Sequence, residues 1–196
     1  LESSFESISF NAIYIIYIAR CHMSYDNWNE AIDTIKPNIH GFSPEEILEY
    51  KPDLILSRCY REVSDFAEAH IQLTKYESYA KNDIQHRFEI SQLAFCNNHW
   101  NKVISQFDKI AIDSKYLPDE INIIHIQSLR FAKQHLTALQ ILKNITTPGN
   151  ETIQFKAELA EIYSDLKEWD SAANLWIQLI GIVDNAYYRL AESYRM

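Results

Sequence analysis

Glycine is scarce in this chain, and its scarcity excludes several classes of protein. Only 3 of the 196 residues are glycine, and they stand alone at positions 41, 149 and 181. Phosphate-binding loops, dinucleotide-binding folds and nucleophile elbows need glycines at fixed spacings, because only glycine permits their tight turns and close backbone approaches. β-Sandwiches and β-barrels need a turn signal about every 8 to 12 residues, and the chain has only 5 prolines to add. The sequence therefore predicts an all-α protein with short connections.

Cysteines, positive charges and long apolar runs are also few. The 3 cysteines include no C-x-x-C pair, which is typical of a reducing compartment, so we expect a cytoplasmic protein. The chain has 18 Lys and Arg against 27 Asp and Glu, a net charge of -9, whereas nucleic-acid binding needs a dense cationic face. The most apolar stretch, residues 8–18, is interrupted by Ser9 and Asn11 and is too short to span a bilayer. We expect neither nucleic-acid binding nor membrane insertion.

A pattern of aromatic and small residues repeats along the chain. In each copy an aromatic residue or a histidine is followed three positions later by alanine or valine. The pairs are Trp28 with Ala31, Phe66 with Ala69, Trp100 with Val103, His135 with Ala138, and Trp169 with Ala172. Successive pairs are 38, 34, 35 and 34 residues apart. The recurrence predicts one structural unit repeated five times.

Two further positions recur in the same register. Twelve residues before each small residue lie Ala19, Ser57, Ser91, Ile126 and Ala160, and Ala191 begins another copy. Four residues after each small residue lie Ile35, Leu73, Phe107, Leu142 and Trp176. Small side chains on facing helices allow close approach, and large apolar residues at helical spacing continue a buried stripe. Each unit is therefore predicted to be a pair of antiparallel helices.

These residues resemble the tetratricopeptide repeat (TPR) family, whose unit of about 34 residues is a helix-turn-helix. The resemblance rests on the mostly small residues at the eighth and twentieth positions of the units. The fourth unit departs from it, with Ile126 in place of a small residue and His135 in place of the aromatic residue. It implies an all-α fold, an α-solenoid of antiparallel helix pairs that forms a TPR-like right-handed superhelix. We expect a single array over residues 1–196, with units near 12–45, 50–83, 84–117, 119–152 and 153–183 and a partial sixth at 184–196.

Two segments depart from a regular array. The first interval contains four additional residues, and Ser43-Pro44-Glu45-Glu46 is a capping-box signature that predicts a short extra helical turn there. Residues 184–196 form an apolar helical stripe with no second helix after them. This last helix is therefore expected to be the cap of the array, or the chain is part of a longer protein, or the helix docks on another surface and mediates self-association.

The titratable residues form no catalytic pattern. Cys96 and His99 are three residues apart, but a zinc site needs four ligands, or three and a water, and no second pair accompanies them. Acid pairs such as Glu158 and Glu161 are more typical of a solvated helix face than of acid-base chemistry. We expect no catalytic residue, no metal and no cofactor within this chain.

The resemblance implies that ligands lie along the concave face formed by the first helix of each unit. The polar and aromatic residues at the corresponding positions are Arg20, Arg58, Arg61, Gln92, Phe95, Gln127 and Arg130. Guanidinium and amide groups suit carboxylates, phosphates and sugar hydroxyls. Two interpretations stay open, because the arginines could neutralise neighbouring acidic residues or could bind an anionic ligand. One TPR subtype grips carboxylates with Lys and Asn, and the matching positions here are Ile16, Arg20 and Ile55, so that specificity is not expected.

The sequence thus predicts a non-catalytic TPR-like scaffold that binds a peptide or protein segment, including an anionic one, in its concave groove. The alternative is the repeat region of a larger bacterial enzyme, such as a surface-polysaccharide glycosyltransferase. In that case the array would bind an acidic polysaccharide or mediate assembly, and catalysis would lie outside these residues.

Overall fold

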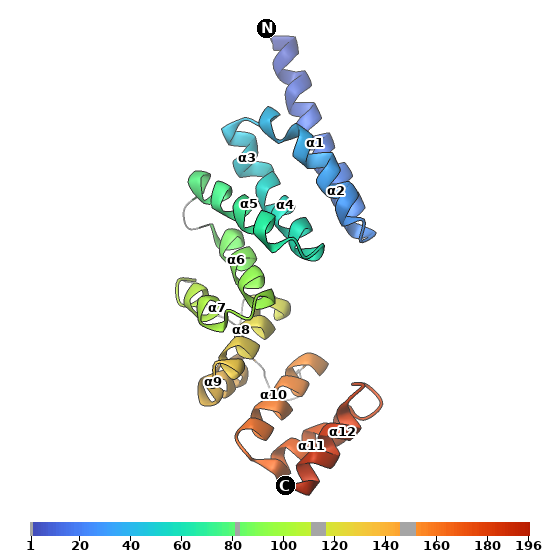
Figure 1. Ribbon diagram of the computed structural model, residues 1–196, viewed down its shortest axis with the longest axis vertical. Coiled ribbons are helices and arrows are strands. Elements are labelled where there is room, and N and C mark those ends of the chain that lie inside the picture. Colours follow the sequence, from blue (N-terminus) through green and yellow to red (C-terminus); the bar gives the residue numbers. More distant parts are fainter. Residues whose placement is uncertain (1, 81–82, 111–116, 146–151) are drawn as a thin grey trace. The chain divides into compact units, whose positions relative to one another are not determined.

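The computed structural model describes the backbone of residues 2–80, 83–110, 117–145 and 152–196, and the side chains in these ranges from residue 12 onward. Within them every regular element is a helix. The chain forms two compact units, Leu1–Leu93 and Ala94–Met196, which divide inside helix α6 (Figure 1). Each unit has a hydrophobic core of its own.

Unit 1 contains two helix pairs and the beginning of a third. The first helices of these pairs are α1 (Glu2–Ser24), α4 (Pro52–Glu62) and α6 (Ile84–Cys96). The second helices are α2 (Trp28–Ile35) and α5 (Phe66–Tyr79). A 3-10 helix, η1 (Lys36–Gly41), and the short helix α3 (Pro44–Tyr50) connect α2 to α4.

Unit 2 continues the same alternation and ends on a single helix. The first helices are α8 (Asp119–Phe131), α10 (Ile153–Asp165) and α12 (Ala186–Arg195). The second helices are α7 (Trp100–Phe107), α9 (His135–Ile145) and α11 (Trp169–Leu179). The described part of the chain is therefore an α-solenoid, as predicted.

The repeated aromatic position marks the start of every second helix. Trp28, Phe66, Trp100, His135 and Trp169 are the first residues of α2, α5, α7, α9 and α11. The small residues that follow three positions later, and the large apolar residues four positions after those, are all buried. Burying one large apolar side chain stabilises the fold by about 1.5–3 kcal/mol. The predicted helix pairs are confirmed. The residues that recur in the sequence are those that pack between the two helices of each pair.

The turn inside each pair contains a residue in the left-handed region, and none of these residues is glycine. Five residues with φ between 57° and 64° occupy the turns: Asp26, Ser64, Asn98, Lys133 and Lys167. The amide that follows each of them donates a hydrogen bond to a carbonyl five residues earlier, as Asp65 does to Tyr60 at 2.8 Å. A side chain in this conformation costs roughly 1–2 kcal/mol. The chain therefore closes its tight turns without glycine and retains some strain at each.

The predicted extra turn in the first interval is helix α3. The Ser43 hydroxyl accepts a hydrogen bond from the Glu46 amide at 3.2 Å, and the Ser43 amide donates to the Glu46 carboxylate at 2.8 Å. Pro44 occupies the first helical turn, where a missing amide proton is tolerated. The capping box is confirmed. Helix α3 ends at Tyr50, and the left-handed φ of 53° at the next residue, Lys51, turns the chain directly into α4.

Candidate functional site

Three first helices of unit 1 line a pocket of about 290 Å³. Two of the predicted binding residues, Arg20 on α1 and Arg58 on α4, lie in its wall. We call it the basic pocket, and its lining residues are Arg20, Met23, Lys51, Leu54, Ile55, Arg58, Gln85 and Glu89. One wall is apolar, and among the lining residues three carry positive charge and one carries negative charge. The pocket therefore lies on the helices from which the resemblance expects ligand contacts.

Lys51 is held in the pocket wall by the start of α6. Its ammonium lies 2.7 Å from the Asp83 carboxylate, which also accepts hydrogen bonds from the Tyr76 hydroxyl at 2.9 Å and the Gln85 amide at 2.7 Å. Burial alone would raise the pKa of Asp83, but the donors Lys51 and Tyr76 lower it below its ordinary value. The charge of Lys51 is thus matched inside the protein, and the network fixes the edge of the pocket.

Arg61 is also matched by acidic neighbours. Its side chain is only 9% exposed, and its guanidinium lies 2.7 Å from the Glu89 carboxylate and 3.0 Å from that of Glu62. It also donates a hydrogen bond to the side-chain oxygen of Gln92. Burial raises the pKa of Glu89, although Arg61 and Arg58 act in the opposite direction. Arg61 and Gln92 therefore join α4 to α6, as the neutralising interpretation expects.

Arg20 and Arg58 differ from Lys51 and Arg61, two cations of unit 1 that form ion pairs. Both residues are exposed, and neither has a carboxylate oxygen within 4.0 Å among the residues that the structure describes. A guanidinium offers five N–H donors in a planar fork that matches a carboxylate or a phosphate. These two side chains therefore have donors available to a ligand in the basic pocket.

In unit 2 the predicted arginine is occupied. The Arg130 guanidinium lies 3.4 Å from Glu158, 3.5 Å from Glu161 and 3.4 Å from Asp165, all on α10. Gln127 donates a hydrogen bond to Glu158, so both predicted polar residues of α8 face the same acidic helix. Three carboxylates thus surround one guanidinium group, and the charge of Arg130 is matched within unit 2.

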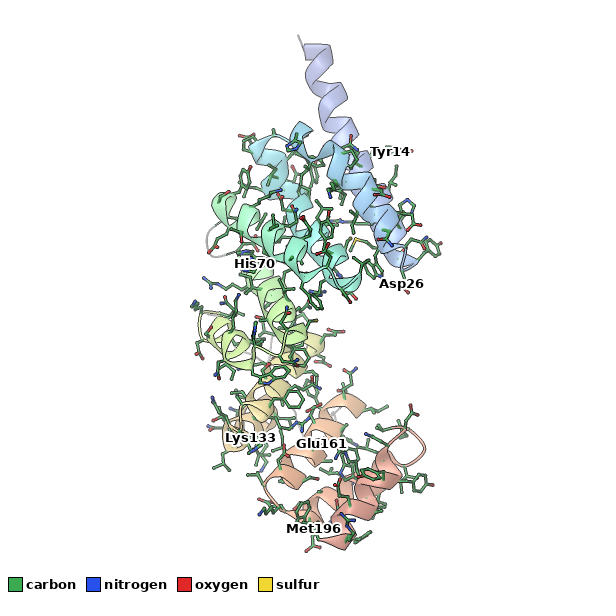
Figure 2. All side chains as sticks on the ribbon, in the orientation of Figure 1. Tyr14, Asp26, His70, Lys133, Glu161 and Met196 are labelled. Carbon is green, nitrogen blue, oxygen red and sulfur yellow. The ribbon has the colours of Figure 1, made fainter. Side chains whose placement is uncertain are left out.

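Glu161, which is labelled in Figure 2, extends this network to the last helix. Its carboxylate lies 2.9 Å from the Arg189 guanidinium of α12, which in turn lies 3.2 Å from Glu192. Burial raises the pKa of Glu161, while Arg189 and Arg130 lower it by a smaller amount. The first helices of unit 2 are thus tied to one another by ion pairs in which acidic groups are in excess.

Phe95, the remaining predicted residue, lies in an aromatic cluster of unit 2. Its ring centroid is 5.2 Å from that of Trp100 and 6.5 Å from that of Phe131, and Arg130 lies over the Phe131 ring at 4.7 Å. The structure therefore brings Arg20 and Arg58 to one pocket, whereas Arg61, Gln92, Phe95, Gln127 and Arg130 make intramolecular contacts.

Two charged lining residues of the basic pocket were missed by sequence reasoning. Glu89 has the same position in its unit as Ile55 in the preceding one, so the repeat register could have placed it there. Lys51 precedes α4 and reaches the pocket through its left-handed backbone, for which the sequence gives no signal.

Groups that could support other chemistry are sparse. In the described ranges, no cluster of three or more His, Cys, Asp or Glu side chains could hold a metal ion. The three cysteines are free, and burial raises the pKa of the Cys59 thiol to about 11, which disfavours the nucleophilic thiolate. Within the same ranges, none of the helices combines the length and the apolar character needed to cross a membrane.

Helix pairs with a repeat near 34 residues, buried small residues and left-handed turns define a helical-repeat protein of the α-solenoid class. Solved structures identify the fold as that of the tetratricopeptide repeat. A TPR protein from Parabacteroides merdae has a TM-score of 0.75 at 15% identity, over 94% of this chain and 73% of that one. A TPR protein from Thermus thermophilus has a TM-score of 0.63 at 10% identity, over 94% of this chain and 100% of that one.

A third similar structure is a component of the Cut9 and Hcn1 hetero-tetramer of the APC/C. Its TM-score is 0.74 at 14% identity, and the match covers 91% of this chain but 35% of that one. No protein-family model matches this sequence, and no curated protein matches it either. Identities this low establish the fold alone, and the fold is consistent with a protein-interaction scaffold.

Proposed function

We propose that the chain is a non-catalytic scaffold that binds an extended protein segment on the first helices of unit 1. Arg20 and Arg58 hold a carboxylate of that segment, from an acidic side chain or from its C-terminus. The observation that carries the proposal is the pair of exposed guanidinium groups in one pocket, neither of which has a carboxylate oxygen within 4.0 Å among the described residues.

The composition of the basic pocket supports a peptide rather than a small inorganic anion. Met23, Leu54 and Ile55 give the pocket an apolar wall beside the two arginines. A peptide can place an apolar side chain on this wall while its carboxylate meets the guanidinium groups. A hydrogen bond to a charged group contributes about 1.5–3 kcal/mol, so two arginines suffice for a specific, reversible contact.

The charge distribution limits the proposed site to unit 1. The protein has a net charge of -9, and the first helices of unit 2 carry an excess of acidic groups around Arg130 and Arg189. An anionic segment would be repelled there by Glu158, Glu161 and Asp165. A cytoplasmic location suits this proposal, because free thiols persist in a reducing compartment.

A library of random peptides, selected on the immobilised full chain, tests the proposal. We expect the selected peptides to be enriched in Asp or Glu next to an apolar residue, and the Arg20→Ala/Arg58→Ala variant to lose their binding. The matched control is Lys102→Ala/Lys109→Ala, which removes the same charge from two exposed residues of unit 2. Selection of peptides without acidic residues, or equal binding to the arginine variant, would contradict the proposal.

An acidic polysaccharide is the other class of ligand that these arginines could bind. Hyaluronan added as a competitor distinguishes it from a peptide. We expect hyaluronan to leave peptide binding unchanged, because a sugar chain does not occupy the apolar wall. Displacement of the peptide at low hyaluronan concentration would overturn the assignment of a protein ligand.

A further inference from the structure

Two of the charged residues that line the basic pocket are balanced by partners outside its wall. The Lys51 ammonium lies 2.7 Å from the Asp83 carboxylate, and the Glu89 carboxylate lies 2.7 Å from the Arg61 guanidinium. In each pair one member lines the pocket and the other does not. Both lining charges are therefore already engaged inside the protein.

The other two charged lining residues, Arg20 and Arg58, occupy equivalent positions in the first two units. Neither has a carboxylate oxygen within 4.0 Å in the part of the chain that the structure describes. The later units carry no positive charge at this position, where they have Gln92, Gln127, Glu161 and Glu192. Two guanidinium groups without an ion-pair partner thus face one pocket of about 290 Å³, and the repeat places such a pair nowhere else along the chain.

A dianion matches two guanidinium groups better than a carboxylate does. A carboxylate has one negative charge and two oxygens, and one bidentate contact to a guanidinium engages both oxygens. A phosphate monoester has a charge of about -1.5 to -2 at pH 7 and three terminal oxygens. It can therefore accept hydrogen bonds from Arg20 on one side and from Arg58 on the other.

The rest of the pocket wall indicates where such a phosphate comes from. Met23, Leu54 and Ile55 form the apolar wall beside the arginines, and the side-chain amide of Gln85 supplies a further neutral donor. Inorganic phosphate would leave the apolar wall uncovered. A phosphorylated side chain with an apolar neighbour in the same peptide would cover it, and each buried CH₂ group adds about 0.8 kcal/mol.

We infer that the basic pocket recognises a phosphorylated serine or threonine of the bound protein segment, with Arg20 and Arg58 contacting its phosphate from two helices. The inference rests on the proposed function and names the anion that the site binds best. An unmodified Asp or Glu of the segment is then the weaker form of the same anchor. Phosphorylation of the partner, rather than a change in this chain, controls how tightly the scaffold holds it.

Three peptide libraries, bound to the immobilised full chain, test the inference. Their central residue is phosphoserine, aspartate or serine, and their flanking residues are random. We expect the best phosphoserine peptide to bind about tenfold more tightly than its aspartate form, because the second guanidinium adds a hydrogen bond to a charged group. The serine form should bind near background, and the flanking residues should be enriched in apolar side chains.

Single substitutions test the role of the second arginine. In Arg20→Ala and in Arg58→Ala one guanidinium remains, so the tenfold preference for phosphoserine over aspartate should fall to about twofold or less. Lys102→Ala, which removes one exposed positive charge from unit 2, is the matched control and should keep the full preference. Circular dichroism verifies that each variant is folded.

The pH dependence of binding provides a second measurement. Affinity for the phosphoserine peptide should fall severalfold from about pH 7.5 to about pH 5, because the phosphate takes up a proton with a pKa of about 6. The aspartate peptide, with a pKa of about 3.9, stays ionised over this range. Burial raises the pKa of Glu89 and the donors around Asp83 lower its pKa, but both groups act on the two peptides alike. The ratio of the two affinities therefore isolates the phosphate.

The possible failures are distinguishable. Equal affinity for the phosphoserine and aspartate peptides, both lost in Arg20→Ala/Arg58→Ala, would overturn the phosphate assignment and leave the proposed function intact. Peptide binding that is unaffected by that double variant would overturn both. Displacement of the phosphopeptide by inorganic phosphate at equal concentration, or tighter binding of vesicles that contain phosphatidic acid, would overturn the assignment of a protein segment as the source of the phosphate.

Discussion

The Arg61 guanidinium lies 2.7 Å from the Glu89 carboxylate, whereas Arg58, three residues earlier on the same helix, has no carboxylate within 4.0 Å among the described residues. Both arginines belong to α4 and both were predicted to face a ligand. Their surroundings differ because the Glu89 carboxylate of α6 forms an ion pair with Arg61 and not with Arg58. One helix thus carries an arginine that joins two helices and another that is available to a ligand.

This difference predicts that substituting the two arginines affects stability unequally. Arg61→Ala should lower the free energy of unfolding by about 1–3 kcal/mol, because Glu89 would stay largely buried without its partner. Arg58→Ala should change it by less than about 0.5 kcal/mol, as for most surface substitutions. Urea denaturation followed by circular dichroism measures both values. Equal effects of the two substitutions would show that the ion pair of Arg61 with Glu89 does not contribute to stability.

Glycine should improve a left-handed turn that now contains serine. Ser64 is exposed with φ of 63°, a conformation that glycine adopts without steric cost. Ser64→Gly should raise the free energy of unfolding by about 0.5–1 kcal/mol, and Ser64→Val, whose branched side chain fits this region poorly, should lower it. Thermal melts of the two variants measure the effect. A lower melting temperature for the glycine variant would contradict the assigned turn.

His125 should make the stability of unit 2 depend on pH. Its ring stacks on Phe107 at 4.1 Å between centroids, and burial lowers its pKa from 6.5 to about 4. The unfolded chain therefore binds this proton at a higher pH than the folded chain. The stabilisation is complete above pH 6.5 and is lost as the pH falls toward about 4, at up to about 1.4 kcal/mol per pH unit.

His125→Phe tests this pH dependence, because phenylalanine keeps the stack on Phe107 and cannot be protonated. The free energy of unfolding should fall less steeply between pH 6.5 and 4 in the variant than in the unmodified protein. His86, whose pKa is also lowered chiefly by burial, remains in both proteins and leaves a shared slope. Identical slopes in the two proteins would mean that folding does not change the pKa of His125.

Ala172 should tolerate no large side chain. It is completely buried in a cluster with Ala160 of α10 and Trp176 of its own helix, α11. Ala172→Arg should destabilise unit 2 by about 3 kcal/mol or more, because a charge and extra volume would enter a close helix contact. Asn174→Arg, at an exposed position on the same helix, is the control and should leave the melting temperature nearly unchanged. Similar melting temperatures would show that the repeat register is wrong.

The fold was predictable because packing repeats in the sequence. Trp28 and Ala31 alone carry little information, but five such pairs in phase specify where each second helix begins. The capping box at Ser43 and Glu46 predicted where α3 begins, because the side chain of each residue accepts a hydrogen bond from the backbone amide of the other. Local signals and a repeated helix contact therefore sufficed for the architecture.

The site was only partly predictable, because ion pairing depends on neighbours far apart in sequence. The register named Arg58, Arg61 and Arg130 as equivalent candidates. It could not show that Glu89, 28 residues after Arg61, or Asp165, 35 residues after Arg130, would pair with them. Which charged side chains pair between helices depends on the geometry of those side chains. The periodicity of a single sequence does not specify that geometry.

The most direct test of the proposed peptide site is a double-mutant cycle between Arg58→Ala and the acidic residue of a selected peptide. Binding of the peptide and of its Asp→Asn or Glu→Gln form is measured by calorimetry with the unmodified protein and with the variant. We predict a coupling energy of about 1–2 kcal/mol, because the guanidinium of Arg58 meets that carboxylate. A coupling below about 0.3 kcal/mol, with the peptide still bound, would contradict the assignment of Arg58 as its partner.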